Sequence, residues 1–246
     1  IYASEGQPYG VIVGKKLNRT EAGEVIYENG LPTFDDKASV LGNGNYDFTL
    51  GFRNAFSYKN LSMSVLVDMK FGADVYSMSK MQSHVNGTSK ETLEGREGWY
   101  ASEQARLSAN VDAKDWTPTG GYVGKGVKAV TDADGNVSYV PNDVYVDPAK
   151  YWQALQNSSP EPFICDNSFV KLREVSLSYS CPKKWFVHTP IESVTLSAYG
   201  RNLLLIYSKV DNIDPESSYN NGNGQGFEYG SLPSRRTFGF GINVKF

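Results

Sequence analysis

The sequence predicts an all-β protein made of antiparallel strands from a transmembrane β-barrel, and three observations predict it. Apolar and polar residues alternate along several segments, as they do where successive side chains of a strand point to opposite faces of a sheet. Short connections between these segments alternate with long ones, whereas a soluble sandwich distributes its loop lengths more evenly. No run of 18 or more apolar residues exists, so no transmembrane helix is expected.

The last ten residues, 237–246, show the alternation most clearly. Glycine, asparagine and lysine alternate there with apolar residues, which are Phe238, Phe240, Ile242, Val244 and Phe246. The nine residues from Phe238 match the roughly 9–11 residues that a tilted strand needs to cross a bilayer. We therefore expect these five apolar side chains to face lipid.

Four further segments repeat this pattern. Residues 46–58 and 61–71 are joined by two residues, and their expected lipid-facing side chains are Phe48, Leu50, Phe52, Val65 and Val67. Their other face carries Arg53, Asp68 and Lys70, as a polar barrel lumen requires. Residues 168–181 and 194–207 place Leu177 and Leu196 on the lipid side. The alternation slips at Arg173 and Glu174, which indicates a β-bulge.

Three long connections separate these strands. Residues 1–45 are predicted to be a loop with a short strand near residues 11–13. Residues 79–167 are predicted to be a loop that contains a helix over residues 89–106. Residues 208–233 are predicted to be a loop rich in turn formers. Long loops in ordered proteins are usually functional. Their aromatic rings suit stacking on sugars or contact with a partner protein, and the candidates are Trp99, Tyr100, Trp116, Tyr151, Trp152, Tyr219 and Tyr229. The same rings could instead form an interfacial girdle or pack the loops on themselves.

Other classes of function find little support. The net charge is −3 with no basic block, which argues against nucleic acid as a partner. A predicted strand separates Cys165 from Cys181 by more than a disulfide can span, so both are expected to be unpaired. His84 and His188 are expected to be solvated rather than catalytic. No nucleophile motif, phosphate-binding glycine loop or metal-ligand spacing is present, so we expect no enzyme, cofactor or metal.

Five strands cannot close a barrel by themselves. Open sheet edges would leave unpaired backbone groups in lipid, and bacterial single-chain barrels have an even number of strands. We therefore expect this chain to be a piece of a larger barrel. Two other hypotheses remain, a soluble β-rich carbohydrate-binding or adhesin-like module and a passive porin.

Several segments resemble SusC/RagA-type TonB-dependent transporters. They occur in the family's order and are residues 6–10, 41–48, 72–76, 168–184, 200–203, 214–216 and 233–246. The similar segments are distributed across most of the chain. Residues 28–36 depart from the family pattern, because an Asp- and Gly-rich segment is reduced there, and an ion site at that place loses its support.

The resemblance implies a 22-stranded barrel filled by a plug, of which this chain supplies the last five strands. The plug and the TonB box of the family are absent from this sequence. The resemblance further implies a SusD-like lipoprotein partner, contact with the TonB complex through the missing N-terminal part, and import of oligosaccharides or peptides. The expected location is the outer membrane of a Gram-negative, Bacteroidetes-type bacterium. Membrane lipid is then a further partner, and the three long loops are extracellular.

Overall fold

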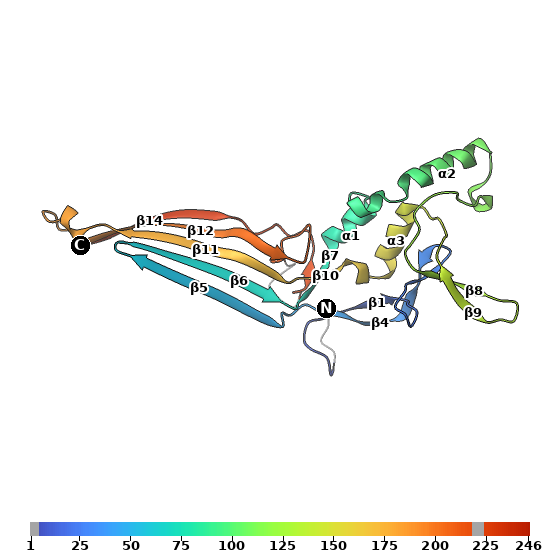
Figure 1. Ribbon diagram of the computed structural model, residues 1–246, viewed down its shortest axis with the longest axis horizontal. Helices are drawn as coiled ribbons and strands as arrows, with labels where there is room; N and C mark the ends of the chain where they lie inside the picture. Colours follow the sequence, from blue (N-terminus) through green and yellow to red (C-terminus); the bar gives the residue numbers. More distant parts are fainter. Residues whose placement is uncertain (1–4, 218–223) are drawn as a thin grey trace. The chain divides into compact units, whose positions relative to one another are not determined.

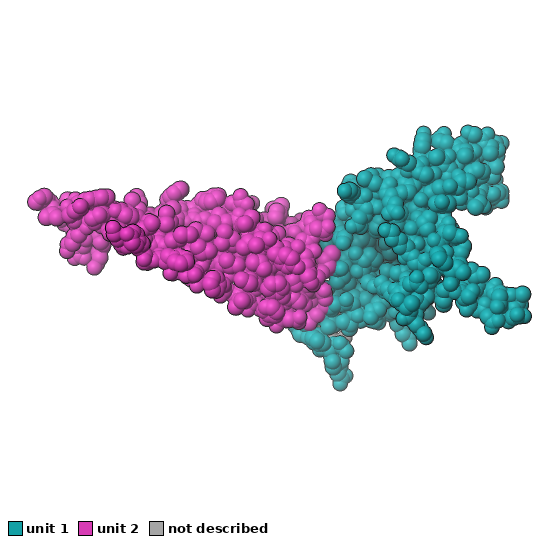
Figure 2. All heavy atoms as spheres, viewed as in Figure 1, with its two compact units in different colours: residues 1–42, 76–164, 227–229 teal, residues 43–75, 165–226, 230–246 magenta. Residues whose placement is uncertain are grey.

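The computed structural model describes residues 5–217 and 224–246, and the chain forms two compact units (Figure 2). Unit 1 comprises residues 1–42, 76–164 and 227–229, and unit 2 comprises residues 43–75, 165–226 and 230–246. The chain passes from one unit to the other within the strands β4 (Phe34–Asn43), β7 (Asp74–Ser77) and β10 (Ile164–Asp166), and again on either side of residues 227–229. Tyr219, one of the candidate contact residues, lies outside the described residues.

Unit 2 contains a five-stranded antiparallel sheet with the order β14-β12-β11-β6-β5 (Figure 1). The strands are β5 (Phe48–Tyr58), β6 (Leu61–Phe71), β11 (Phe169–Ser180), β12 (Ser193–Ser208) and β14 (Thr237–Lys245). The five predicted strands are therefore confirmed, and their ends differ from the expected ones by no more than two residues. The alternation located them because each strand keeps one face apolar along most of its length.

Two local features fix the register of this sheet. Lys59 takes a positive φ of 52° in the two-residue turn between β5 and β6, as the turns that suit the twist of a hairpin require. The predicted bulge is confirmed, because β11 shifts its register against both neighbours between Leu172 and Glu174. The connection from β11 to β12 contains the short helix η4 (Lys183–Trp185).

Residues 1–45 contain more strand than the predicted loop. They form β1 (Val11–Leu17), β2 (Ile26–Glu28), β3 (Leu31–Pro32) and β4 (Phe34–Asn43). Strand β1 pairs with β4, and a second sheet has the order β3-β2-β8-β9 with β8 (Val127–Thr131) and β9 (Val137–Pro141). The alternation missed these strands because β2 and β3 have three and two residues, and β4 mixes charged and small residues on both faces.

Apart from η4, the helices of the described residues belong to unit 1. They are α1 (Met78–Val85), η1 (Lys90–Leu93), α2 (Arg96–Ser108), η2 (Ala113–Asp115), α3 (Pro148–Ser158) and η3 (Glu161–Phe163). The helix expected over residues 89–106 is divided, because Gly95 takes the left-handed conformation (φ 82°) and α2 begins only after it. Among the described residues, no helix is both long and apolar enough to cross a membrane.

Unit 1 has a core rich in aromatic side chains. Its buried members are Tyr27, Met81, Tyr122, Tyr151, Trp152, Leu155 and Phe163. Beside it, β13 (Phe227–Glu228) pairs in parallel with β7. The carboxylate of Glu228 is 1% exposed and accepts hydrogen bonds from Ser77 Oγ (2.9 Å), Ser79 Oγ (2.7 Å) and Ser79 N (3.1 Å). This buried anion lies at the N-terminus of α1, where the helix dipole stabilises negative charge.

Candidate functional site

The sheet of unit 2 has one continuous apolar face. Directly opposed residues share a face, and the register aligns Phe52 with Val67, Leu177 with Ala198, and Ala198 with Phe240. The same register places on this face eleven of the residues expected to meet lipid: Phe48, Leu50, Phe52, Val65, Val67, Leu177, Leu196, Phe238, Phe240, Ile242 and Val244. Phe246 follows in the same phase and is 75% exposed.

Much of this apolar face is uncovered within the chain. Phe240 is 87% exposed and Ile242 73%, whereas Val65 and Val67 are half-buried by their neighbours. Soluble monomers rarely expose an apolar area spread over five adjoining strands. The face therefore requires a covering that the described residues of unit 2 do not supply.

The opposite face of the sheet is polar and small. It carries serine pairs such as Ser57 and Ser62, whose hydroxyls are 3.0 Å apart, and Arg53, which donates to Ser64 Oγ at 3.0 Å. Tyr199 lies over Gly239 on the neighbouring strand, so closely that a Cβ at Gly239 would fall 2.3 Å from the ring. One face is thus suited to lipid and the other to water or to polar protein groups.

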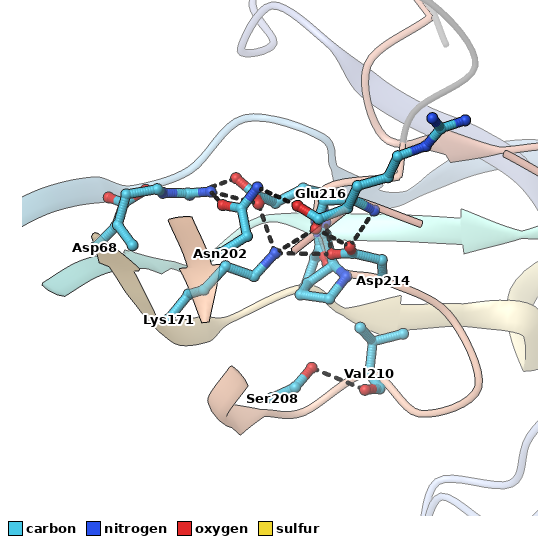
Figure 3. A network of polar contacts seen from close by, with 12 residues as sticks. Asp68, Lys171, Asn202, Ser208, Val210, Asp214 and Glu216 are labelled. Carbon is cyan, nitrogen blue, oxygen red and sulfur yellow. Dashed lines mark hydrogen bonds and ion pairs between the residues drawn. The ribbon is translucent and has the colours of Figure 1, made fainter. Parts of the chain in front are cut away.

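A cluster of ion pairs lies on this polar face (Figure 3). Lys171 Nζ donates to Glu216 at 2.6 Å, to Asp214 at 3.2 Å and to Ser234 Oγ at 2.9 Å. Arg173 donates to both oxygens of Glu216, at 2.6 and 2.8 Å, and to Asp68 at 2.5 Å. Lys171 and Arg173, on either side of Leu172 at the bulge of β11, both reach the carboxylate of Glu216. The alternation alone would place both on one face, but it does not predict their partners.

These contacts fasten residues 214–216 to the sheet. Burial raises the pKa of Glu216, but the hydrogen bonds from Arg173 and Lys171 outweigh it and hold that pKa below the usual range. Burial likewise raises the pKa of Asp214, and the hydrogen bonds from Ser234 and from the Glu216 amide bring it below the usual range. Both carboxylates therefore remain charged at neutral pH, and the connection between β12 and β14 is anchored on the polar face.

Unit 1 contains a cleft of about 320 Å³ with aromatic walls. Trp99 of α2 and Trp152 of α3 line it together with Arg96, Asp147 and the end of α1. The Arg96 guanidinium donates to Thr92 O (2.7 Å) and Gly87 O (2.6 Å) and forms no ion pair among the described residues. Asp147 caps α3, where one carboxylate oxygen accepts from Ala149 N at 2.9 Å. The cleft thus offers a flat ring, a cation and a carboxylate to a ligand.

His84 is buried rather than solvated, which corrects the expectation from the sequence. It is 3% exposed, and its ring lies 4.5 Å from that of Trp152. Nδ1 lies 2.8 Å from Lys80 O and Nε2 lies 2.8 Å from Glu91 Oε2. Both ring nitrogens of His84 thus lie within hydrogen-bond distance of an oxygen. His84 therefore joins α1 to η1. His188 is exposed, as expected.

The candidate contact residues lie in different environments. Trp99 and Trp152 share the cleft, and Tyr151 lies in the core of unit 1 at 7% exposure, with its hydroxyl 3.3 Å from that of Tyr27. Trp116 is half-buried and donates from Nε1 to Ser102 Oγ at 3.1 Å. Tyr100 and Tyr229 are 67% and 52% exposed. The structure thus brings two of the candidates together and leaves Tyr100 and Tyr229 on open surface.

The described residues hold no group of three or more His, Cys, Asp or Glu arranged to bind a metal ion. Cys165 and Cys181 form no disulfide in the part of the chain that the structure describes. The functional groups that the sequence did not reveal are the ion pairs around Arg173, which join residues 105 and 43 positions apart. The break in alternation at Arg173 was the one signal available.

Comparison with known proteins gives a consistent result. No protein-family model matches the chain. TonB-dependent receptor P3 of Formosa agariphila is 27% identical over 213 residues, which are 84% of this chain and 17% of that protein. TonB-dependent receptor P26 of the same organism is 29% identical over 223 residues, which are 89% of this chain and 19% of that protein. The chain is homologous to TonB-dependent receptors. It spans less than a fifth of the length of these two receptors.

A solved structure agrees on the fold. A chain of the RagAB peptide transporter matches with a TM-score of 0.52 at 15% identity, over 97% of this chain and 23% of that one. This match shows a shared fold. Together with the homology to TonB-dependent receptors it confirms the resemblance found in the sequence and the expected fold class, antiparallel strands that form a small part of a larger barrel.

Proposed function

We propose that this chain is part of a TonB-dependent outer-membrane transporter that imports large nutrients, either oligosaccharides or peptides, together with a SusD-like lipoprotein. The observation that carries the proposal is the uncovered apolar face that continues across all five strands of the unit 2 sheet. Homology to TonB-dependent receptors supports it independently. The activity is transport rather than catalysis, and the location is the outer membrane of a Bacteroidetes-type bacterium.

The energetics of the apolar face favour a bilayer over water. Burying apolar surface contributes roughly 25 cal/mol for each Å², so exposing Phe238, Phe240 and Ile242 to water is costly, whereas exposing them to acyl chains is not. The strands are 9–16 residues long, which suits a tilted crossing of a bilayer. The polar face with its ion pairs then lines the barrel interior, where residues 214–216 are anchored.

In this proposal the short connections at residues 59–60 and 181–192 are periplasmic. The long segments 1–45, 79–167 and 208–233 are extracellular. The aromatic cleft of unit 1 is the part we assign to contact with substrate or with the lipoprotein, through Trp99 and Trp152, and Tyr100 and Tyr229 are exposed rings for the same purpose. The plug and the contact with the TonB complex belong to parts of the transporter outside this chain.

A pair of spin labels tests the orientation of the sheet in the full-length protein. Cysteine-attached nitroxides replace Phe240 on one face and Gly241 on the other, in reconstituted vesicles. We expect the label at 240 to collide with oxygen, which dissolves in lipid, and the label at 241 to collide with a water-soluble nickel chelate. Equal contact of both labels with the chelate would refute the membrane orientation.

Transport itself is tested in cells. Fluorescein-labelled pools of oligosaccharides and of peptides are offered to strains that lack this gene or lack TonB. The proposal expects at least one pool to accumulate in the parent strain and in neither deletion strain. Uptake that persists without TonB would indicate a passive porin.

A further inference from the structure

The short-connection end of the unit 2 sheet has a distinct surface. The register places three features at this end: the turn between Tyr58 and Leu61, the connection from Ser180 to Ser193, and the last residues of β14 (Figure 1). We call this surface, formed by residues 57–62, 178–195 and 243–246, the basic end.

The basic end differs in charge from the rest of the chain. It contains Lys59, Lys183, Lys184 and Lys245 against the one acid Glu192, a formal side-chain charge of +3. Because the whole chain carries −3, the remaining residues carry −6. Lys245 pairs with Glu192 at 3.0 Å. Among the described residues, Lys183 and Lys184 have no carboxylate within ion-pair distance, so their charge is available to an anion.

Large apolar side chains stand beside these lysines. Trp185 is 59% exposed, Val187 68% and Tyr58 72%. Lys59 Nζ lies 5.3 Å from the centre of the Tyr58 ring. Aromatic rings next to lysines are typical of membrane–water interfaces, where the ring lies at the headgroup level and the ammonium reaches the phosphates.

A cleft of about 580 Å³ opens within the basic end. Lys183 and the ion pair of Lys245 with Glu192 line the cleft, so Lys183 provides its excess positive charge, and Phe186, Val187 and Ile191 provide apolar walls. Lys184 adjoins Lys183 in the sequence but is not part of the lining. Ser193 and Lys245, which line the cleft, are cross-strand partners at the end of the sheet, so the cleft adjoins the apolar face at Val194 and Val244. A ligand that fits must combine an anionic group with apolar chains.

We propose that the basic end binds the headgroup of an anionic phospholipid of the phosphatidylglycerol class. Lys183 and Lys184 contact the phosphate, Trp185 and Val187 lie at the acyl boundary, and the acyl chains follow the apolar face. This inference rests on the proposed function, because it needs that face to meet lipid. A free phosphate would satisfy the lysines but would leave the apolar walls in water, so the lipid fits the cleft better.

Native mass spectrometry of the full-length protein tests this. The protein is reconstituted in nanodiscs with equal amounts of phosphatidylglycerol and phosphatidylcholine, and the lipids it retains after release into detergent are counted. We expect enrichment of phosphatidylglycerol. In the double variant Lys183→Gln/Lys184→Gln, the enrichment of phosphatidylglycerol over phosphatidylcholine should fall roughly fivefold for each lysine removed. The variant Lys183→Arg/Lys184→Arg should keep the enrichment because it keeps the charge.

A matched control removes two exposed lysines from unit 1, Lys90→Gln/Lys150→Gln, and should leave the enrichment unchanged. Equal retention of both lipids by the parent protein, or an unchanged preference in the Lys183/Lys184 glutamine variant, would overturn the proposal. So would displacement of the lipid by inorganic phosphate at millimolar concentration. Failure of the proposed function is recognised separately, because the spin label at position 240 would then report water whatever lipid is present.

Discussion

At the scale of single residues, Lys171 shows how the sheet holds a distant segment in place. Its side chain is 5% exposed and is shared between Asp214 and Glu216. The ammonium group of Lys171 balances the negative charge of two carboxylates that are largely shielded from water. Removing it leaves Asp214 without its ion pair and Glu216 with Arg173 alone in a poorly hydrated site, and that is more costly than the loss of an exposed ion pair.

We expect Lys171→Met to release residues 214–216 from the sheet. Breaking a buried ion pair costs about 3 kcal/mol, so amide hydrogens of residues 208–217 should exchange roughly a hundredfold faster. Lys209→Met is the matched control, because its pair with Asp166 is 53% and 39% exposed and such pairs are worth about 0–1 kcal/mol. Equal exchange in the two variants, measured on full-length protein in detergent, would contradict an anchoring role.

The pair of His84 and Glu91 makes unit 1 sensitive to acid. The hydrogen bond from His84 holds the pKa of Glu91 below its usual range. A lowered pKa contributes stability that is present above the unfolded value of about 4.3 and is lost as the pH falls through the folded value. We expect α1 to loosen below about pH 4. In Glu91→Gln this acid-dependent step should disappear, as monitored by hydrogen exchange of residues 78–85.

At the scale of elements, the contact between β12 and β14 depends on a glycine. Tyr199 and Gly239 are direct partners, and the ring covers the place where a side chain would stand. An aromatic ring over a glycine of the next strand is a known way to stabilise such a pair. At Gly241, two residues further along β14, a Cβ would lie 2.8 Å from Ser197 Oγ, so there too the neighbouring strand leaves little room for a side chain.

Gly239→Val should therefore destabilise the sheet, whereas Gly51→Val should not. The valine would force the Tyr199 ring aside, at a cost of roughly 1–3 kcal/mol, while no atom lies within 4 Å of a Cβ at Gly51. The comparison is made by the urea midpoint of the folded full-length protein in detergent. A lower midpoint for Gly51→Val than for Gly239→Val would mean that the ring contact is unimportant.

The elements of the two units were not equally predictable from sequence. The strands of unit 2 were found because their two faces meet different surroundings, so that apolar and polar residues alternate without interruption from Phe238 to Val244. The segments of unit 1 show no such alternation of apolar and polar residues. Its core joins Tyr27, Tyr122 and Tyr151 from distant segments. Tyr151 was expected to contact a substrate or partner because no periodicity marked it as buried. For the same reason the partners of Arg173 could not be inferred, since they follow from the fold.

At the scale of the whole molecule, the sheet of unit 2 is incomplete. Among the described residues, β5 and β14 are its two outer strands, and each pairs with a neighbour on one side. Long outer strands with free backbone groups are templates for further pairing. In a transmembrane barrel they would pair with other strands of the same protein, which agrees with the much greater length of the homologous receptors.

We expect the isolated 246-residue chain to be insoluble as a monomer in detergent-free buffer. Its apolar face and its two free edges should drive aggregation, which light scattering after gel filtration would detect. Adding detergent should cover the face but not the edges, so the chain should become dispersed while remaining oligomeric. A soluble β-rich binding module would instead give a monodisperse monomer in buffer that unfolds cooperatively. That outcome would remove the physical basis of the transporter proposal, because the apolar face would then need no lipid.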